Sequence, residues 1–296
     1  MRGLSVLSIG VALGVFAGVS LRFLGDDAQA PVELESEPPT EIVVAPKSDR
    51  LKGIADLFAD KVVRIERFFA PRNSTPDLQV RRQISDLVHF YVYSETPPNV
   101  KPAEVARNAL DDVPIGTPIE EIRRASNAFS LDFNFMKTVA KVESDFDPKQ
   151  RTGSYIGLFQ LSNYEFSRYG AGDILNPRDN SIAAAFKFAV SAATFELTTH
   201  KKPTISDLYL IHQQGTEGAE EHVTHPERIA WKSMCATEEG REKGEQWCKR
   251  AIWANTLPAV KQVWKSVDNL TSGVFVKMWE DRIDGLYTRY SEAAAN

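Results

Sequence analysis

Apolar residues recur at intervals of three and four positions through most of this chain, and this spacing predicts helices. A first run covers residues 51–69, with the stripe Leu51, Ile54, Phe58, Val62, Ile65 and Phe69. A second run, from about Asp77 to Tyr93, carries Leu78, Ile84, Leu87, Val88 and Tyr91. A short third helix is expected near residues 102–110, and a last run contains Phe275, Met278, Trp279, Ile283, Leu286 and Tyr290. The fold class that we expect is therefore all-α.

Polar residues mark where the central helices should begin. Thr117, Pro118 and Glu120 supply an N-cap, a proline at the first helical position and a capping box, so we expect a helix from there to about Phe129. Asp132 caps the next expected helix, "FNFMKTVAKVES". The run "SNYE" at residues 162–165 is a second capping box, and Gly170 should end the helix that follows it.

Glu143 falls on the apolar face of the helix that Asp132 caps, in line with Met136, Val139 and Ala140. It also lies in the last turn, where the helix dipole is negative. Desolvation and the dipole both disfavour the carboxylate, so both should raise the pKa of this group. A carboxyl group that is still protonated near neutral pH is what protonation of a glycosidic oxygen requires. The alternative is a glutamate at a frayed helix end, pointing into water.

The loop that follows Glu143 carries groups suited to sugar binding. Gly153, Ser154 and Gly157 allow tight turns. The aromatic faces come from Tyr155, Phe159 and Tyr164, and Gln160 offers an amide for hydroxyl or acetamido groups. For any one of these aromatic residues, packing in the core is the alternative.

The N-terminus has the pattern of a targeting segment. Nineteen uncharged residues lie between Arg2 and Arg22, long enough to span a bilayer. Ala28-Gln29-Ala30 is typical of a signal cleavage site, although Pro31 suits that junction poorly. Residues 1–30 are thus a cleaved signal or a membrane anchor formed by residues 3–21, and residues 31–48, rich in Pro and Glu, are a linker. Either reading exports the rest of the chain to the periplasm or cell envelope.

The two cysteines and the charge narrow the function further. Cys235 and Cys248 are expected to form a disulfide after export, with two separately buried thiols as the alternative. The net charge of -5 does not favour nucleic-acid binding. The chain contains neither a Gly-x-Gly-x-x-Gly pattern nor a P-loop, so we expect no cofactor.

Two motifs resemble those of the soluble-lytic-transglycosylase and goose-type lysozyme group. That group shows Glu-Ser-x-Phe-x-Pro, a loop rich in Ser and Gly, then Gly-Leu-Met-Gln. The matching residues here are Glu143, Ser144, Phe146, Pro148, Gly157, Leu158 and Gln160, with Phe159 where Met is usual. A later stretch, "LNPRDNSIAAAFKFA", is similar to a further family helix through Pro177 and Asn180. In "LYLIHQQG", Gly215 matches, while His212 and Gln213 replace a Tyr and an Asn of the family.

The resemblance implies a fold and an activity. It covers about Thr117 to Gly215 and implies a lysozyme-like helical domain over residues 113–225. The apolar spacing outside this region predicts a small helical module at 49–112 and a helical extension at 226–296, which contains the expected disulfide and packs on the catalytic domain. Members of the group cut the β-1,4 bond between N-acetylmuramic acid and N-acetylglucosamine in peptidoglycan. Glu143 would be the acid and base, and the substrate contacts would come from Ser144, Ser154, Tyr155, Gly157, Phe159, Gln160, Tyr164, His212 and Gln213.

The absence of a convincing second carboxylate in the sequence favours a lytic transglycosylase, which forms a 1,6-anhydro product, over a hydrolase. A non-catalytic peptidoglycan-binding assembly factor is a further alternative. The expected partners are glycan strands and an envelope protein that binds the N-terminal helical module; the membrane is reached only through the N-terminal segment. His222 and His225 could ligate zinc, but a solvated charge cluster is the preferred interpretation there, and we expect no metal site.

Overall fold

The structure is a computed structural model that describes residues 76–96 and 98–295. Of these residues 68% are helical and 4% lie in strands, so the expected all-α class is confirmed. The expected signal or anchor (1–30), the linker (31–48) and the apolar stripe at 51–69 lie outside the described residues. None of the helices within the described ranges is long and apolar enough to cross a membrane.

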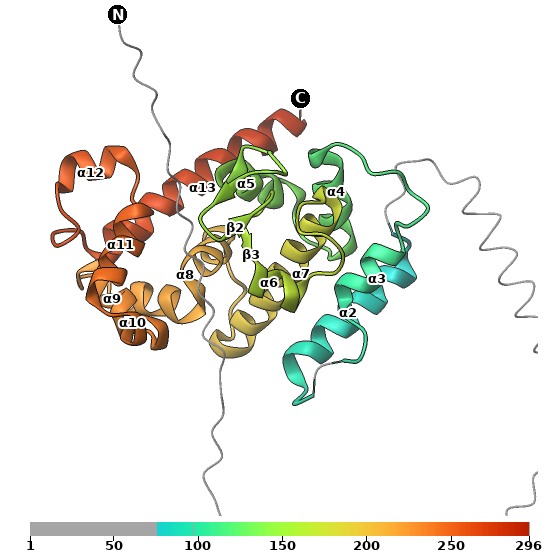
Figure 1. Ribbon diagram of the computed structural model, residues 1–296, viewed down its shortest axis with the longest axis horizontal. Coiled ribbons are helices and arrows are strands. Elements are labelled where there is room, and N and C mark those ends of the chain that lie inside the picture. Colours follow the sequence, from blue (N-terminus) through green and yellow to red (C-terminus); the bar gives the residue numbers. More distant parts are fainter. Residues whose placement is uncertain (1–75, 97, 296) are drawn as a thin grey trace, which may run out of the picture. The chain divides into compact units, whose positions relative to one another are not determined.

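The first described helices are α2 (Leu78–Tyr93) and α3 (Pro102–Asn108), and both pack against the long helix α7 (Pro177–Thr199) (Figure 1). Asp77 caps α2 by accepting a hydrogen bond from the backbone N–H of Val80. The prediction was wrong for one residue of the apolar stripe, because Leu78 is 68% exposed. It lies six positions before the buried Ile84, which at 3.6 residues per turn puts it on another face of the helix.

The central helices begin at the predicted capping residues. Helix α4 (Pro118–Ala128) begins at the Thr117–Glu120 capping box, and α5 (Phe133–Ser144) begins at Asp132. Helix α6 (Asn163–Tyr169) begins at the second capping box, and its C-cap is Gly170. Between α5 and α6 lies a small antiparallel sheet, which the sequence did not predict. Its strands are β1 (Arg151–Thr152), β2 (Tyr155–Ile156) and β3 (Leu161–Ser162), paired in that order.

Helix α8 (Ile205–Thr224) follows α7 and bends at Gly215, whose φ of 75° and ψ of 168° interrupt the helical conformation. The C-terminal part contains α9 (Ala230–Ala236), α10 (Glu238–Lys243), α11 (Glu245–Ala254), α12 (Pro258–Trp264) and α13 (Ser272–Ala295). The expected disulfide is confirmed: Cys235 of α9 and Cys248 of α11 are bonded, with their Cα atoms 5.6 Å apart. Helix α13 runs back along α8 and α5, so the C-terminal extension packs on the central helices (Figure 1).

One hydrophobic core joins these regions. It includes residues of α2 and α3 together with residues of α5, α7, α8, α11 and α13. Arg178 of α7 is buried, donates to the backbone carbonyls of Leu110, Val113 and Pro114, and forms an ion pair with Glu121. The boundary expected near residue 112 therefore does not separate two cores, because a buried arginine binds that connection to α7.

A buried histidine in α8 predicts how stability depends on pH. His222 is fully buried, shares a hydrogen bond of 3.0 Å between Nδ1 and the Ser272 hydroxyl, and stacks near Phe275. Burial, with a smaller effect of the nearby Arg228, lowers the pKa of His222 to about 3. The unfolded chain takes up a proton near its ordinary pKa of about 6.5, whereas the folded chain does not.

Stability should therefore fall as the pH drops below about 6.5, and the His222 contribution between about pH 7 and pH 5 should be about 2 kcal/mol. His222→Gln should remove this part of the slope in urea unfolding curves recorded at a series of pH values. His225→Gln, at an exposed position of the same helix end, is the control for the loss of a histidine from this region. Equal slopes for wild type and His222→Gln would show that His222 titrates alike in both states.

Candidate functional site

Glu143 lies in the last turn of α5, with its side chain only 5% exposed. Met136, Val139 and Ala140 are fully buried on the same face, so the helix directs the carboxyl group into the protein. The hydroxyl of Tyr209, from α8, donates a hydrogen bond to this carboxyl group. Glu143 is thus held between two helices, away from bulk water.

This environment makes Glu143 a weak acid. Burial raises its pKa from 4.5 to about 7, and the negative charge of Glu165 acts in the same direction. The hydrogen bond from Tyr209 and the positive charge of Lys187 oppose this shift, but burial is the larger effect. Close to half of the molecules therefore carry a protonated Glu143 at neutral pH, which is the state that a general acid needs.

Tyr209 is the contact that the sequence reasoning missed. Its hydroxyl accepts a hydrogen bond of 3.2 Å from the Gln213 amide, so its own proton is free to go to Glu143. The ring packs against Trp279 of α13 with 5.2 Å between centroids, which brings the C-terminal extension up to the site. Helical spacing in the sequence could have indicated this contact. Tyr209 lies three positions before His212 and four before Gln213, which puts it on the same helix face.

His212 lies beside the acid, with Nε2 3.8 Å from Oε1 of Glu143. Its imidazole is buried and hydrogen-bonds the backbone carbonyl of Phe159. Burial and the positive charge of Lys187 hold the pKa of His212 well below its ordinary value of 6.5. The ring is therefore neutral across the physiological pH range and exerts no imidazolium charge on Glu143.

A buried ion pair lies behind His212. Lys187 of α7 and Glu165 of α6 are almost completely buried, with Nζ and Oε1 2.6 Å apart. The same ammonium lies 3.0 Å from Nδ1 of His212. Glu165 also receives hydrogen bonds from the backbone and hydroxyl of Ser162 at the start of α6, as its capping box requires.

Side chains from three helices hold the loop at residues 156–160. The Ser144 hydroxyl at the end of α5 donates to the Leu158 carbonyl at 2.9 Å. The Asn180 amide of α7 accepts from the Phe159 N–H and donates to the Ile156 carbonyl, at 3.0 and 3.2 Å. His212 of α8 bonds the Phe159 carbonyl, so α5, α7 and α8 each hold this loop through one side chain.

Most of the residues expected to contact substrate are instead buried, and they pack against or hydrogen-bond other parts of the protein. Phe159 is fully buried against Phe188, Tyr155 is buried in β2, and Ser144 and Gln213 direct their polar atoms to protein partners. Gln160 is also buried, and its amide donates to the carbonyls of Gln150 and Gly157. Its Oε1 has no hydrogen-bond partner within the described ranges. Of the expected contact side chains, those of Ser154 and Tyr164 are exposed.

The two histidines considered for zinc point to different partners. His222 is buried against Ser272, whereas His225 is exposed and bonds the hydroxyl of Thr224. Across residues 76–96 and 98–295, no group of three or more His, Cys, Asp or Glu side chains is placed to hold a metal ion.

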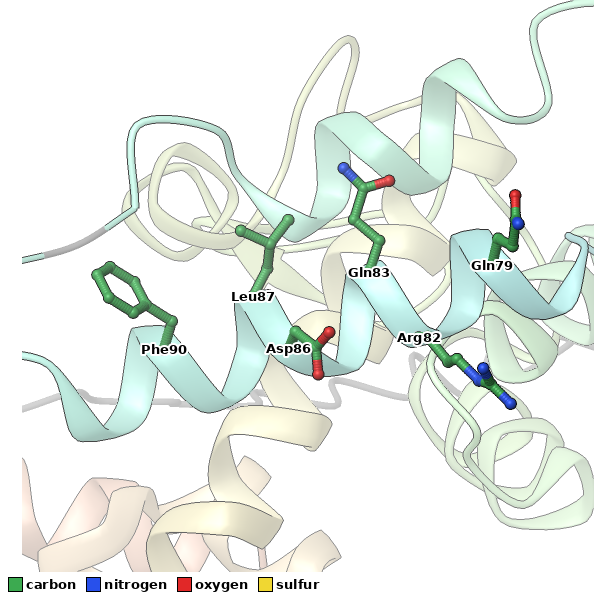
Figure 2. Close-up of a pocket in the computed structure, with 6 residues that line it drawn as sticks. All are labelled: Gln79, Arg82, Gln83, Asp86, Leu87 and Phe90. Carbon is green, nitrogen blue, oxygen red and sulfur yellow. The ribbon is translucent and has the colours of Figure 1, made fainter. Parts of the chain in front are cut away.

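A shallow hollow of about 550 Å³ lies along α2. Figure 2 shows Gln83 and Leu87 on one side of this helix and Arg82 and Asp86 turned away from them. Its lining residues are Gln79, Arg82, Gln83, Asp86, Leu87 and Phe90, none of which belongs to the cluster around Glu143. The envelope partner expected to bind the N-terminal helices stays a prediction.

The loop geometry predicts an unusual sensitivity at Gly157. Its φ is +83°, and an added Cβ would lie 2.4 Å from the Asn180 amide nitrogen that holds the loop. Gly157→Ala should therefore cost about 1–3 kcal/mol of backbone strain and, in addition, displace Asn180. Gly153→Ala is the matched control, because its φ is +61° and an added Cβ meets nothing within 4 Å. Urea unfolding should show the larger loss for Gly157→Ala, and equal losses would mean that the Asn180 contact tolerates a side chain.

Comparison with known proteins adds no family to this picture. No family model matches the chain, and no curated protein matches it. The resemblance to lytic transglycosylases therefore rests on the motif residues themselves.

Proposed function

We propose that this chain is a peptidoglycan lytic transglycosylase with Glu143 as its general acid and base. The observation that carries the proposal is the buried carboxyl group of Glu143, which is bonded to Tyr209 and whose pKa of about 7 keeps a large fraction of it protonated near neutral pH. The resemblance of Glu143-Ser144 and of the Gly157–Gln160 loop to the family motifs supports the same assignment.

The neighbouring carboxylates favour a transglycosylase over a two-carboxylate hydrolase. Asp145 is 74% exposed and pairs with Lys141, and Asp147 is exposed and accepts from the Lys149 N–H. Glu165 is buried but is bound by Lys187 and by the cap of α6. The first two are thus exposed and the third is bound by other groups, whereas ordinary glycosidases place a second carboxyl group across the bond that is cut.

The proposed reaction needs one acid that gives and regains a proton. Glu143 donates its proton to the glycosidic oxygen, and the N-acetylglucosamine part leaves with a free 4-hydroxyl. The C6 hydroxyl of the muramic acid then bonds to its own C1 and returns its proton to Glu143. The sum is an intramolecular transfer without water, and the hydrogen bond from Tyr209 keeps the carboxyl group oriented through both steps.

The setting proposed for this reaction is the cell envelope. Residues 1–30 would export the chain to the periplasm or keep it at the inner membrane, where glycan strands are the partner. A hydrolase of the same bond, or a binding factor without activity, would use the same arrangement of helices and loop around Glu143. The buried acid favours an enzyme, because a binder gains nothing from desolvating a carboxyl group.

The test is the variant Glu143→Gln assayed on purified peptidoglycan. The amide can still accept from Tyr209 but cannot give a proton, so the rate should fall by at least about 100-fold while the fold is kept. Mass spectrometry of the wild-type digest should show 1,6-anhydro ends, which are lighter than reducing ends by one water.

Asp147→Asn serves as the control, since it removes an exposed carboxylate four positions further along and should cleave at the wild-type rate. Reducing ends in the wild-type digest would identify a hydrolase. Binding of peptidoglycan without any cleavage by the wild type would refute the catalytic proposal.

A further inference from the structure

The buried ion pair between Glu165 and Lys187 costs free energy of folding, and packing alone does not explain its presence. Both side chains are 2% exposed or less. Transferring two charges from water into a protein interior costs several kcal/mol, and an apolar pair of similar size is often as stable. A cap for α6 does not require it either, because the Ser162 cap needs only the carboxylate of Glu165.

The contacts of Lys187 determine the tautomer of His212. An ammonium group has three donors and no acceptor, so Nδ1 of His212, 3.0 Å from Nζ, must carry a lone pair. The proton of the neutral ring is then on Nε2. That N–H hydrogen-bonds the Phe159 carbonyl and is the edge of the ring that lies 3.8 Å from Glu143.

The pair also supplies the formal charges that act on the acid. The groups that act on Glu143 are Tyr209 and His212 from α8, Lys187 from α7 and Glu165 from α6. From α13, Arg282 acts on Tyr209. Of those acting on Glu143 directly, Tyr209 and His212 are neutral, so one buried cation and one buried anion remain, and their effects on the carboxyl group are opposite.

We propose that Glu165 and Lys187 are positioning residues for Glu143: together they fix His212 as the neutral Nε2–H tautomer beside the acid and place balanced charges behind it. The inference rests on the proposed function in that Glu143 is the acid. It assigns a role to two residues that the motif comparison does not reach, since neither was among the expected site residues.

The two charges predict shifts of opposite sign. Because Glu143 must be protonated to act, the rate falls on the alkaline side of its pH profile. Glu165→Gln keeps a side chain that can cap α6 but leaves the positive charge of Lys187 unbalanced. This charge lowers the pKa of Glu143, so the alkaline limb of the profile should move to lower pH by about 0.5–1 unit. Lys187→Met leaves Glu165 unbalanced and should move the limb up by a similar amount. A loosened site would instead shift both variants the same way or lower the rate at all pH values.

Two further variants separate this effect from a loss of stability. Glu165→Gln combined with Lys187→Met removes both charges and should return the limb to near the wild-type position, even if a single variant folds poorly. Glu121→Gln is the matched control, because Glu121 forms an equally buried ion pair with Arg178 but is not among the groups that act on Glu143. It should destabilise the protein without moving the limb.

A readout that needs no activity completes the test. In ¹⁵N-labelled full-length protein, the His212 imidazole, assigned by its loss in His212→Gln, should show the Nε2–H tautomer from about pH 5 to 8. Lys187→Met should lose this fixed state. Limbs that move in the same direction or not at all, or a wild-type His212 that is protonated or carries its proton on Nδ1, would overturn the inference. If the wild type does not cleave peptidoglycan, the proposed function fails, while the His212 spectra still decide the role of Lys187.

Discussion

The desolvated carboxyl group of Glu143 is the feature on which the other parts of the site depend. A carboxylate resists burial, so the group is stable there only as an acid or with donors close by. Tyr209 supplies the donor, and Trp279 of the C-terminal helix packs behind Tyr209. The extension after residue 225 is thereby part of the surroundings of Glu143, although its helix comes last in the sequence.

The loop from Ile156 to Gln160 meets a second constraint. Its residues are buried, so its peptide groups need partners within the protein, and the backbone supplies only some of them. Ser144, Asn180 and His212 supply others from α5, α7 and α8. This need explains why a hydroxyl, an amide and an imidazole occur on buried helix faces. It also explains why the loop that begins at Gly157 depends on residues that are distant from it in the sequence.

Local signals were readable from the sequence, and long-range ones were not. The capping boxes at Thr117 and Ser162 place helix starts correctly, because a capping box involves only residues three positions apart. The burial of Glu143 follows from helical spacing in the same way. The role of Phe159 as core rather than as a sugar platform depends on Phe188 of α7, and the Lys187 pair depends on α6, so no local pattern could reveal either.

A direct titration of Glu143 tests this account most sharply. In the full-length protein with ¹³C-labelled glutamate, the side-chain carboxyl resonance of Glu143, assigned by its loss in a Glu143 variant, should titrate near pH 7. The ordinary pKa of a glutamate side chain is about 4.3. A Glu143 midpoint near that ordinary value would show that the group is solvated and ionised at neutral pH, and it would contradict its assignment as the acid.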